Sequence, residues 1–246
     1  MTAETEQGQH SELDRAIFIE DIIRPAVSDP LVIKAFEEVD HGAFIPEELR
    51  GRYAYTDSIV PLVEGSTISQ PSLIAEMVEH LDLTGSEKGL EIGTGSGYTA
   101  AILSRRCREV YTIEYNQELA NSAQERLARL GFQNVEVYCG DGLLGLPEKA
   151  PFDAIIVTGA VKTVPPSLIK QLKQGGRIVA PVGENPHDLD LVLGFKKEEF
   201  VPIVVGKVRF VPIVSNLDGG FTEEDFEEER SGVITVRSSH SRTRNN

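Results

Sequence analysis

The stretch 89–101, GLEIGTGSGYTAA, decides how the rest of the chain is organised. A short apolar run that contains Leu90 and Ile92 leads into a turn with three glycines at alternate positions, and a helical pattern of apolar residues begins at Tyr98. Glycine allows the backbone to turn sharply and allows a ligand to approach without meeting a Cβ atom. The stretch therefore predicts a buried strand, a turn able to bind a ligand, and a helix.

The spacing of the three glycines narrows the class of ligand. The loop is not a dinucleotide fingerprint, G-x-G-x-x-G, because that motif would need glycine where Tyr98 stands. It is not a phosphate-binding P-loop either, because no Lys-Ser or Lys-Thr pair follows the glycines. The observed form, Glu-x-Gly-x-Gly-x-Gly with a bulky residue next, resembles the S-adenosylmethionine loop of Rossmann-like methyltransferases. Glycine turns also serve as plain connections between a strand and a helix, so the prediction depends on residues further along the chain.

Two acidic residues stand at the ends of the next predicted strands. The run 110–114 ends in Glu114, 17 residues beyond Gly97, and the run 135–139 is followed by Asp141 between two glycines. A carboxylate at the end of the second strand of a βαβ unit can accept hydrogen bonds from both hydroxyls of a ribose. An acid at the end of the third strand suits the amino group of adenine. The alternatives are a surface glutamate and an Asx turn.

Apolar periodicity predicts a doubly wound α/β fold, and the resemblance of the glycine loop implies that this fold is of the Rossmann-like methyltransferase type. Two strand-like runs, 189–195 and 200–214, have no helix between them and should pair as an antiparallel hairpin at the sheet edge. We therefore expect a mixed sheet in a three-layer α/β/α arrangement, with an ordered loop region that holds short pieces of structure at 40–68. The other expected elements are helices at 13–23, 30–39, from 71, from 98, 116–130 and 164–173, and strands at 90–92, 110–114, 135–139, 154–158 and 177–181.

The chain is expected to hold one domain with an appendage at each end. Residues 1–29 would form a polar segment and a helix, residues 30–217 a single methyltransferase domain, and residues 218–246 an acidic extension with a disordered tail. Within the domain, residues 30–83 would cap the substrate site and residues 84–217 would form the cofactor-binding core.

Composition and charge argue against several classes of function. Hydrophobic side chains make up 40% of the 246 residues and charged side chains 26%, as in ordinary globular proteins. No run of about 18 apolar residues and no secretory signal is found. A net charge of −15 disfavours binding to nucleic acid, and Cys107 and Cys139 show no metal-ligand spacing. We expect a cytoplasmic monomer with no metal, no membrane contact and no nucleic-acid partner.

Residues 30–214 resemble the protein-L-isoaspartate O-methyltransferase family. The more specific matches lie outside the glycine loop, which on its own is common to the wider methyltransferase superfamily. These matches are Thr67-Ile68-Ser69-Gln70-Pro71, Phe44-Ile45-Pro46, Ala54-Tyr55, the stretch 140–160 (GDGLLGLPEKAPFDAIIVTGA) and Val208-Arg209-Phe210-Val211-Pro212.

The resemblance implies transfer of a methyl group from S-adenosylmethionine to the α-carboxylate of an L-isoaspartyl residue, with S-adenosylhomocysteine as the product. Isoaspartyl residues form when asparagine deamidates or aspartate isomerises. Their methyl esters collapse to a succinimide, which reopens in part to normal aspartate. The implied partners are isoaspartyl-containing peptides and proteins, and the implied outcome is protein repair.

The resemblance also assigns roles to individual residues. Ser69 would be the catalytic residue that orients the substrate carboxylate, although a serine before a helix, taken in isolation, would be interpreted as a helix cap. Residues expected to bind the substrate peptide, the last four by strand-like main-chain bonds, are Thr67, Ile68, Gln70, Val208, Arg209, Phe210 and Val211. Residues expected to bind the cofactor are Glu91, Gly93, Thr94, Gly95, Ser96, Gly97, Glu114, Tyr115, Gly140, Asp141, Gly142 and Thr158.

Three positions, Ser66, Ser72 and His41, depart from the family pattern, and the first two flank the expected substrate loop. The sequence leaves open how these departures affect the preference for a peptide. Three alternatives stay open: a methyltransferase acting on an aspartate of a dedicated peptide, a small-molecule or RNA methyltransferase that shares only the cofactor fold, and a non-catalytic adaptor that binds the cofactor. The 67–71 match and the acidic charge disfavour the second, and the intact glycine loop disfavours the third.

Overall fold

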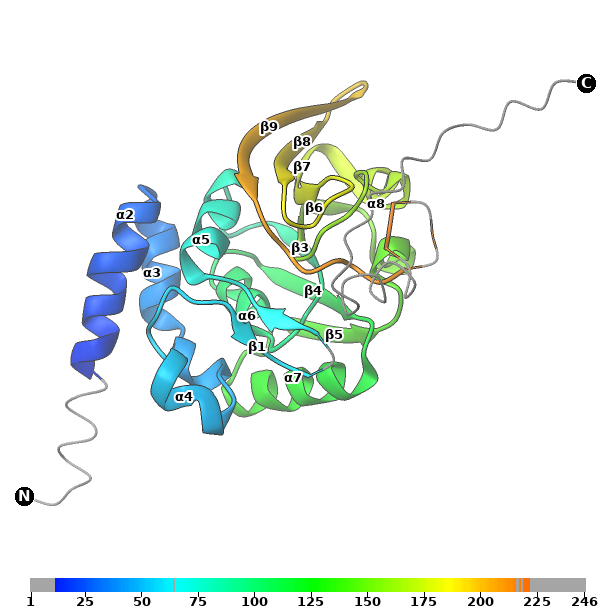
Figure 1. The fold of residues 1–246 in the computed structure, drawn as a ribbon. Helices are drawn as coiled ribbons and strands as arrows, with labels where there is room; N and C mark the ends of the chain where they lie inside the picture. The colour runs from blue at the N-terminus through cyan, green and yellow to red at the C-terminus, as the bar shows by residue number, and fades with distance from the viewer. Residues whose placement is uncertain (1–11, 64, 216, 218, 222–246) are drawn as a thin grey trace, which may run out of the picture.

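A seven-stranded mixed sheet forms the centre of the molecule, seen in a computed structural model that describes residues 12–63, 65–215, 217 and 219–221 (Figure 1). Its strand order is β5-β4-β3-β6-β7-β8-β9. The pairs from β5 to β7 are parallel, and β8 and β9 add antiparallel strands at one edge, which confirms the expected hairpin. The strands are β3 (Lys88–Ile92), β4 (Glu109–Glu114), β5 (Val135–Cys139), β6 (Phe152–Val157), β7 (Leu172–Val182), β8 (Leu189–Lys196) and β9 (Phe200–Val208).

Strand β6 shows why the sheet is covered on both faces. Its side chains alternate between two hydrophobic clusters, with Ala154 and Ile156 in one and Ile155 and Val157 in the other. Successive residues of a strand point to opposite faces, so a continuous apolar run supplies both clusters at once. All four side chains are at most 3% exposed. The expected three layers follow from this pattern.

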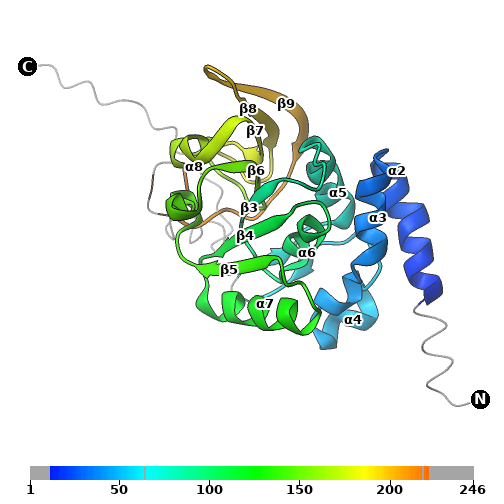
Figure 2. The ribbon, with the colours of Figure 1, turned by 180° about the vertical axis from the view of Figure 1, so that it is seen from behind.

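Helices cover the two faces unequally. The larger cluster joins the sheet to helices α3, α5, α6 and α7, whereas the smaller cluster joins it to α8 and to short 3-10 turns. Figures 1 and 2 show the N-terminal helix outside α3, on the opposite side of the molecule from α8. The helices are α3 (Pro30–Glu38), α4 (Glu47–Tyr53), α5 (Pro71–His80), α6 (Tyr98–Ser104), α7 (Gln117–Arg129) and α8 (Pro166–Gln171).

The first helix is continuous over 12–26 but changes its winding. It is α-helical over 12–18, π-helical over Ile19–Ile23 and α-helical again over Arg24–Ala26 (α2). Pro25 lacks an N–H group, so it cannot donate to the helical ladder at this point. Asp29 then caps α3 by accepting a hydrogen bond from Leu31 N at 2.8 Å, as the Asp-Pro pair predicts.

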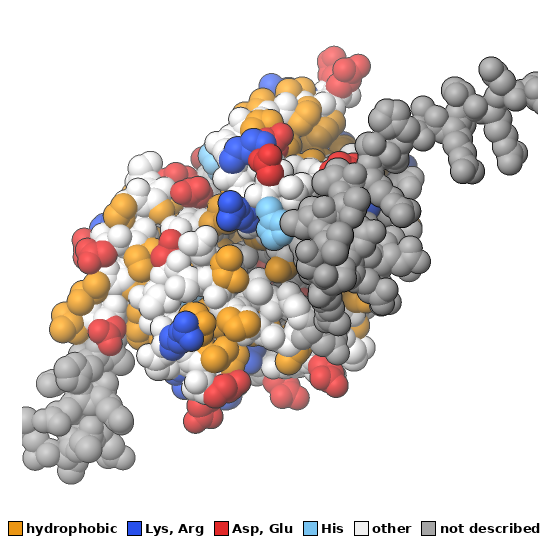
Figure 3. Space-filling view, viewed as in Figure 1, with side chains coloured by type: hydrophobic (Ala, Val, Ile, Leu, Met, Phe, Trp, Pro, Cys, Tyr) orange, Lys and Arg blue, Asp and Glu red, His pale blue; other side chains and the backbone are white. Residues whose placement is uncertain are grey.

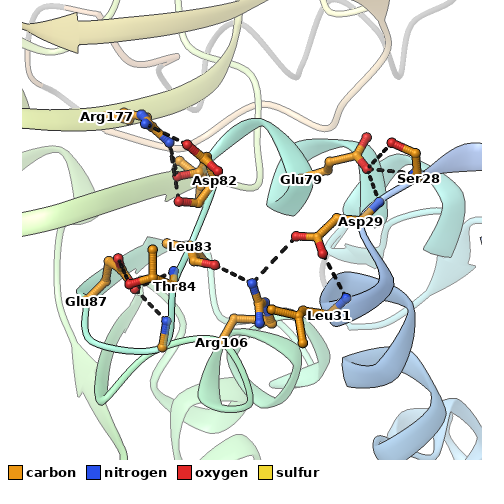
Figure 4. A network of polar contacts seen from close by, with 12 residues as sticks. Ser28, Asp29, Leu31, Glu79, Asp82, Leu83, Thr84, Glu87, Arg106 and Arg177 are labelled. Atoms are coloured by element: carbon orange, nitrogen blue, oxygen red, sulfur yellow. Dashed lines mark hydrogen bonds and ion pairs between the residues drawn. The ribbon is translucent and has the colours of Figure 1, made fainter.

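A polar network ties this N-terminal segment to the core (Figure 4). Glu79 of α5 accepts hydrogen bonds from the backbone N–H groups of Ser28 and Asp29, both at 2.6 Å. Arg106 is 5% exposed; it donates to the Leu83 carbonyl and lies 3.6 Å from the Asp29 carboxylate. A buried charge is costly unless it is paired, so the Arg106–Asp29 contact favours one position of the N-terminal helices on the core.

The segment 40–68 is the expected ordered loop region with short pieces of structure. Helix α4 spans Glu47–Tyr53, and strands β1 (Val60–Pro61) and β2 (Thr67–Ile68) form a small antiparallel pair. One expectation about local structure was wrong in part. The strand expected over 200–214 ends at Val208, and the chain then leaves the sheet.

The acidic extension 218–246, apart from 219–221, lies outside the described residues. In the described part of the chain, no helix combines the length and the apolar character that crossing a bilayer would require.

Candidate active site

The glycine loop connects β3 to α6 at the point where the strand order reverses, which is where doubly wound sheets bind ligands. Gly93 N donates to Ile113 O at 2.8 Å, which fixes the loop to the end of β4. Gly97 has φ 86°, and a Cβ atom there would lie 3.2 Å from Leu127 of α7. A side chain at residue 97 would thus strain the backbone and crowd the Leu127 side chain, so glycine suits the turn.

A hydrogen-bonded chain of buried side chains connects the glycine loop to β3 and β4. The Thr94 hydroxyl lies 2.6 Å from Thr112 Oγ1, which donates to Glu91 Oε2 at 2.6 Å. Glu91 has no exposed surface, and burial raises the pKa of its carboxyl group to about 8, even though the hydrogen bond from Thr112 opposes the change. Glu91 Oε1 has no hydrogen-bond partner among the described residues. The geometry therefore fits a residue that holds the loop rather than one that faces solvent.

Two carboxylates stand at the ends of neighbouring strands beside the loop. Glu114 accepts from Gly95 N at 2.8 Å and from Asn116 N at 3.0 Å, so it binds the loop and the start of α7 at once. Asp141, after β5, accepts from Leu143 N at 2.9 Å. This Asx-type turn is the alternative weighed for Asp141, and the geometry does not exclude a ligand, because each carboxylate oxygen keeps a second lone pair.

The chain after β9 crosses the ends of the parallel strands. Figure 1 shows it running from β9 towards the region of α8. Ala160 N donates to Val211 O at 2.8 Å, and Ile213 N donates to Ala160 O at 2.8 Å, which makes a short parallel bridge beyond the end of β6. Thr158 joins this end to the glycine loop, because its hydroxyl donates to Gly93 O at 2.7 Å. The segment expected to hold a peptide thus lies next to the loop.

Ser69 lies between β2 and α5, on a segment that passes over the glycine loop. A methyl group built on Gly95 would lie 3.6 Å from Thr67 O. The Ser69 hydroxyl makes no hydrogen bond to another described residue. The carboxylate of Asp57, not Ser69, occupies the N-terminus of α5 by accepting from Ser72 N at 3.0 Å. The alternative that Ser69 is a helix cap is therefore wrong, and its hydroxyl is available for a ligand.

The other expected site residues differ in how they could contact a ligand. Tyr115 is 52% exposed, whereas Ile68 and Phe210 are buried. The Arg209 guanidinium donates to His187 O at 3.1 Å, and Gln70 donates through Nε2 to Asp57 O at 3.0 Å. Figure 3 shows the face of the molecule that is viewed in Figure 1. Hydrophobic and uncharged groups cover much of its middle, and most acidic side chains lie towards its rim. Residues that the structure places in or beside the loop or the strand ends are Thr94, Ser96, Gly140, Gly142 and Val208.

Two residues at the site were not anticipated from the sequence. Asp57 fastens the segment that carries Ser69, and Ser215 donates to Asp141 Oδ2 at 2.7 Å. Ser215 is 2% exposed and belongs to the chain after β9, so it links that segment to the end of β5. Neither residue stands in a periodic or glycine-marked pattern, and no signal in the single sequence would have found them.

Comparison with known proteins identifies the family. Residues 14–218 match the family described as protein-L-isoaspartate(D-aspartate) O-methyltransferase. The chain belongs to this family.

Individual members of the protein-L-isoaspartate O-methyltransferase family show the same likeness. "Protein-L-isoaspartate O-methyltransferase 2" of Shewanella sediminis is 47% identical over 191 residues, which cover 77% of this chain and 78% of the relative. A solved protein-L-isoaspartate O-methyltransferase is 34% identical, with a TM-score of 0.76 over 83% of this chain and 67% of its own. A Plasmodium falciparum protein, named as a beta-aspartate methyltransferase and solved with S-adenosyl-L-homocysteine, is 23% identical, with a TM-score of 0.71 over 84% of this chain and 99% of its own. At that identity the last likeness concerns the fold.

Proposed function

We propose that this site transfers a methyl group from S-adenosylmethionine to the α-carboxylate of L-isoaspartyl residues, with Ser69 orienting the carboxylate. The activity follows the family, and one observation supports the assignment of residues. The segment that carries Ser69, whose hydroxyl has no hydrogen-bond partner among the described residues, passes over the glycine loop, with Thr67 O 3.6 Å from a methyl group built on Gly95. A substrate group held at Ser69 would therefore meet a ligand held by the loop.

The residues at the strand ends fit S-adenosylmethionine. Glu114 is 8% exposed and stands one strand away from the glycine loop, where its free lone pairs can accept from the ribose hydroxyls. Asp141 stands one strand further, where it can accept from the adenine amino group. Gly93, Gly95 and Gly97 all have positive φ, which gives the tight turn that places the loop beside these two carboxylates.

The reaction asks for positioning more than for acid–base catalysis. When bound, S-adenosylmethionine supplies a methyl group on a positively charged sulfur, which is a good leaving group. The substrate carboxylate is already anionic at neutral pH, so an oxygen of it can attack the methyl carbon while the bond to sulfur breaks and leaves its electron pair on sulfur. What the protein must supply is an in-line approach in a site from which water is excluded.

The substrate peptide would be held by the end of β9 and the chain that follows it. Residues 208–211 lead from the end of β9 to the bridge at Pro212 beyond the end of β6. Val211 O already accepts from Ala160 N and Phe210 N donates to Pro186 O, so a substrate backbone would pair with other main-chain groups of this segment. Main-chain recognition is tolerant of sequence, which suits an enzyme that must act on damaged residues in many contexts. The methyl ester then leaves the enzyme and collapses to the succinimide, which starts the repair.

Methyl transfer from labelled S-adenosylmethionine to matched peptides with isoaspartate or aspartate tests the proposal. We expect labelling of the isoaspartyl peptide alone. Ser69→Ala should leave the cofactor Kd within about twofold while lowering kcat by roughly tenfold or more, because it removes a positioning group from the substrate and none from the cofactor. Labelling of the aspartyl peptide instead would favour a dedicated aspartate substrate. Equal loss of cofactor binding and turnover in Ser69→Ala would show that Ser69 serves only the fold.

A further inference from the structure

The segment that carries Ser69 is fastened on its N-terminal side by a strand pair. Ile68 pairs with Val60, and Thr67 with Pro61, in the β1–β2 ladder. Ile68 is 4% exposed and Val60 has no exposed surface, so the pair is anchored in the core. Buried ladder pairs fix both the register and the direction of the side chains that come next in the chain. The residue after Ile68 is Ser69.

Asp57 fastens the same segment on its C-terminal side. Asp57 Oδ1 accepts from Ser72 N at 3.0 Å, and Oδ2 accepts from Ser72 Oγ at 2.7 Å. The main-chain oxygen of Asp57 accepts from Gln70 Nε2 at 3.0 Å. Asp57 and Val60 lie three residues apart, so one short stretch of chain holds the residues on both sides of Ser69.

Asp57 and Ser69 have different roles, because only the Asp57 side chain is bound by its neighbours in the described part of the chain. Both carboxylate oxygens of Asp57 are bound to Ser72 at the N-terminus of α5, where a negative charge is favourable. The Ser69 hydroxyl makes no hydrogen bond to another described residue. An anionic substrate would be repelled by a free carboxylate, whereas a carboxylate already bound at a helix N-terminus can order the backbone beside it.

We propose that Asp57 is a positioning residue, which sets the place of the Ser69 hydroxyl relative to the glycine loop by holding Gln70 and Ser72. The inference rests on the proposed function, because it assigns Asp57 a part in the step in which Ser69 orients the substrate. Ser72, one of the three departures from the family pattern, supplies two of the donors that Asp57 binds. In-line transfer is sensitive to displacements of about 1 Å, so loss of this clamp lowers turnover while the cofactor site stays intact.

A double-mutant cycle with the full chain tests the inference. The kcat/KM for an isoaspartyl peptide and the Kd for S-adenosylhomocysteine are measured for the wild type, Asp57→Ala, Ser69→Ala and the double variant. We expect Asp57→Ala to lose about tenfold or more in kcat/KM in the wild-type background, and less than about twofold when Ser69 is already alanine. The Kd should stay within about twofold throughout.

Two further variants separate positioning from stability. Asp57→Asn keeps an oxygen that accepts from Ser72 N, so it should retain activity within about threefold of the wild type. Asp29→Ala removes the N-cap of α3, outside the proposed site, and should lower the melting temperature without changing kcat/KM. Should Asp57→Ala fail to fold, Ser72→Ala removes the hydroxyl that binds Asp57 Oδ2 and is expected to give a smaller loss with the same dependence on Ser69.

Several outcomes would overturn the inference. An equal loss from Asp57→Ala with and without Ser69 would mean that Asp57 acts on the fold or on another group. Full activity of Asp57→Ala would also overturn the inference, and so would a rise in the Kd for S-adenosylhomocysteine that matches the loss in kcat/KM. A wild-type protein that methylates no isoaspartyl peptide would overturn the proposed function as well, and that result is read from the wild type alone.

Discussion

Lowering the pH should destabilise the protein through His41. The imidazole is 1% exposed, stacks on Phe18 with ring centroids 5.4 Å apart, and lies 4.8 Å from the ring of Tyr98. Neither ring nitrogen has a hydrogen-bond partner among the described residues. Burial lowers the pKa of His41 from 6.5 to about 4, although the nearby carboxylates of Asp40 and Asp57 oppose the change. The folded protein therefore holds this side chain in its neutral form.

The sign and size of the effect follow from the two pKa values. The unfolded chain takes up the proton near pH 6.5, whereas the folded chain does so only near pH 4, so the contribution of His41 is fully present above pH 6.5 and is lost as the pH falls towards 4. At about 1.4 kcal/mol per pH unit, the wild type should lose roughly 2 kcal/mol between about pH 7.5 and about pH 5 from this side chain.

Urea unfolding measured at several pH values tests this prediction. Because the chain has no tryptophan, unfolding is followed by far-UV circular dichroism. His41→Phe keeps an aromatic ring at the site and removes the titrating group, so its free energy of unfolding should fall less than that of the wild type over the same range, whatever constant offset repacking adds. Parallel curves for the two proteins would refute the reasoning, since they would show that His41 takes up no proton on unfolding.

Two further predictions concern the cofactor site and the N-terminal segment. Glu114→Ala should weaken binding of S-adenosylhomocysteine by roughly 1–3 kcal/mol in calorimetry, because it removes a charged acceptor; unchanged affinity would mean that Glu114 only orders the loop. Glu79→Ala should lower the free energy of unfolding by about 1–3 kcal/mol, because the N–H groups of Ser28 and Asp29 lose their acceptor; Glu79→Gln, which keeps an acceptor oxygen, should lose less, and equal losses in urea titrations would contradict this account.

The elements that the sequence predicted well carry short-range signals. The expected strand at 135–139 coincides with β5, and the helix at 116–130 matches α7 (Gln117–Arg129) to within a residue at each end. Asn116 caps α7, and Gly131 lies just beyond it with φ 84°, so both helix ends are marked by residues whose effect is local. Strand ends in a parallel sheet meet at one edge, so the grouping of Glu114 and Asp141 also followed from strand order.

Other elements were misjudged because neighbours distant in sequence decided them. Residues 200–214 form one apolar run, yet the strand ends at Val208, and the main chain of 211–213 pairs with Ala160 instead. Similarly, the sequence did not predict the partner of Glu91, which the fold buries beneath the loop, where Thr112 donates to it. Apolar periodicity reports how much of a segment is buried and leaves open which segment covers it.

By itself, the sequence determined the strand–glycine–helix unit and the order along the chain of the strands in the main sheet, because glycine spacing, caps and apolar period act over a few residues. Its short motifs outside the glycine loop, such as residues 67–71, indicated the family. The tertiary structure alone decided what holds the site together. Asp57 meets Ser72 across 15 residues, and Ser215 meets Asp141 across 74. Such contacts form only when separate segments are packed side by side, and hydrogen bonds between distant residues leave no periodic trace in the chain that makes them.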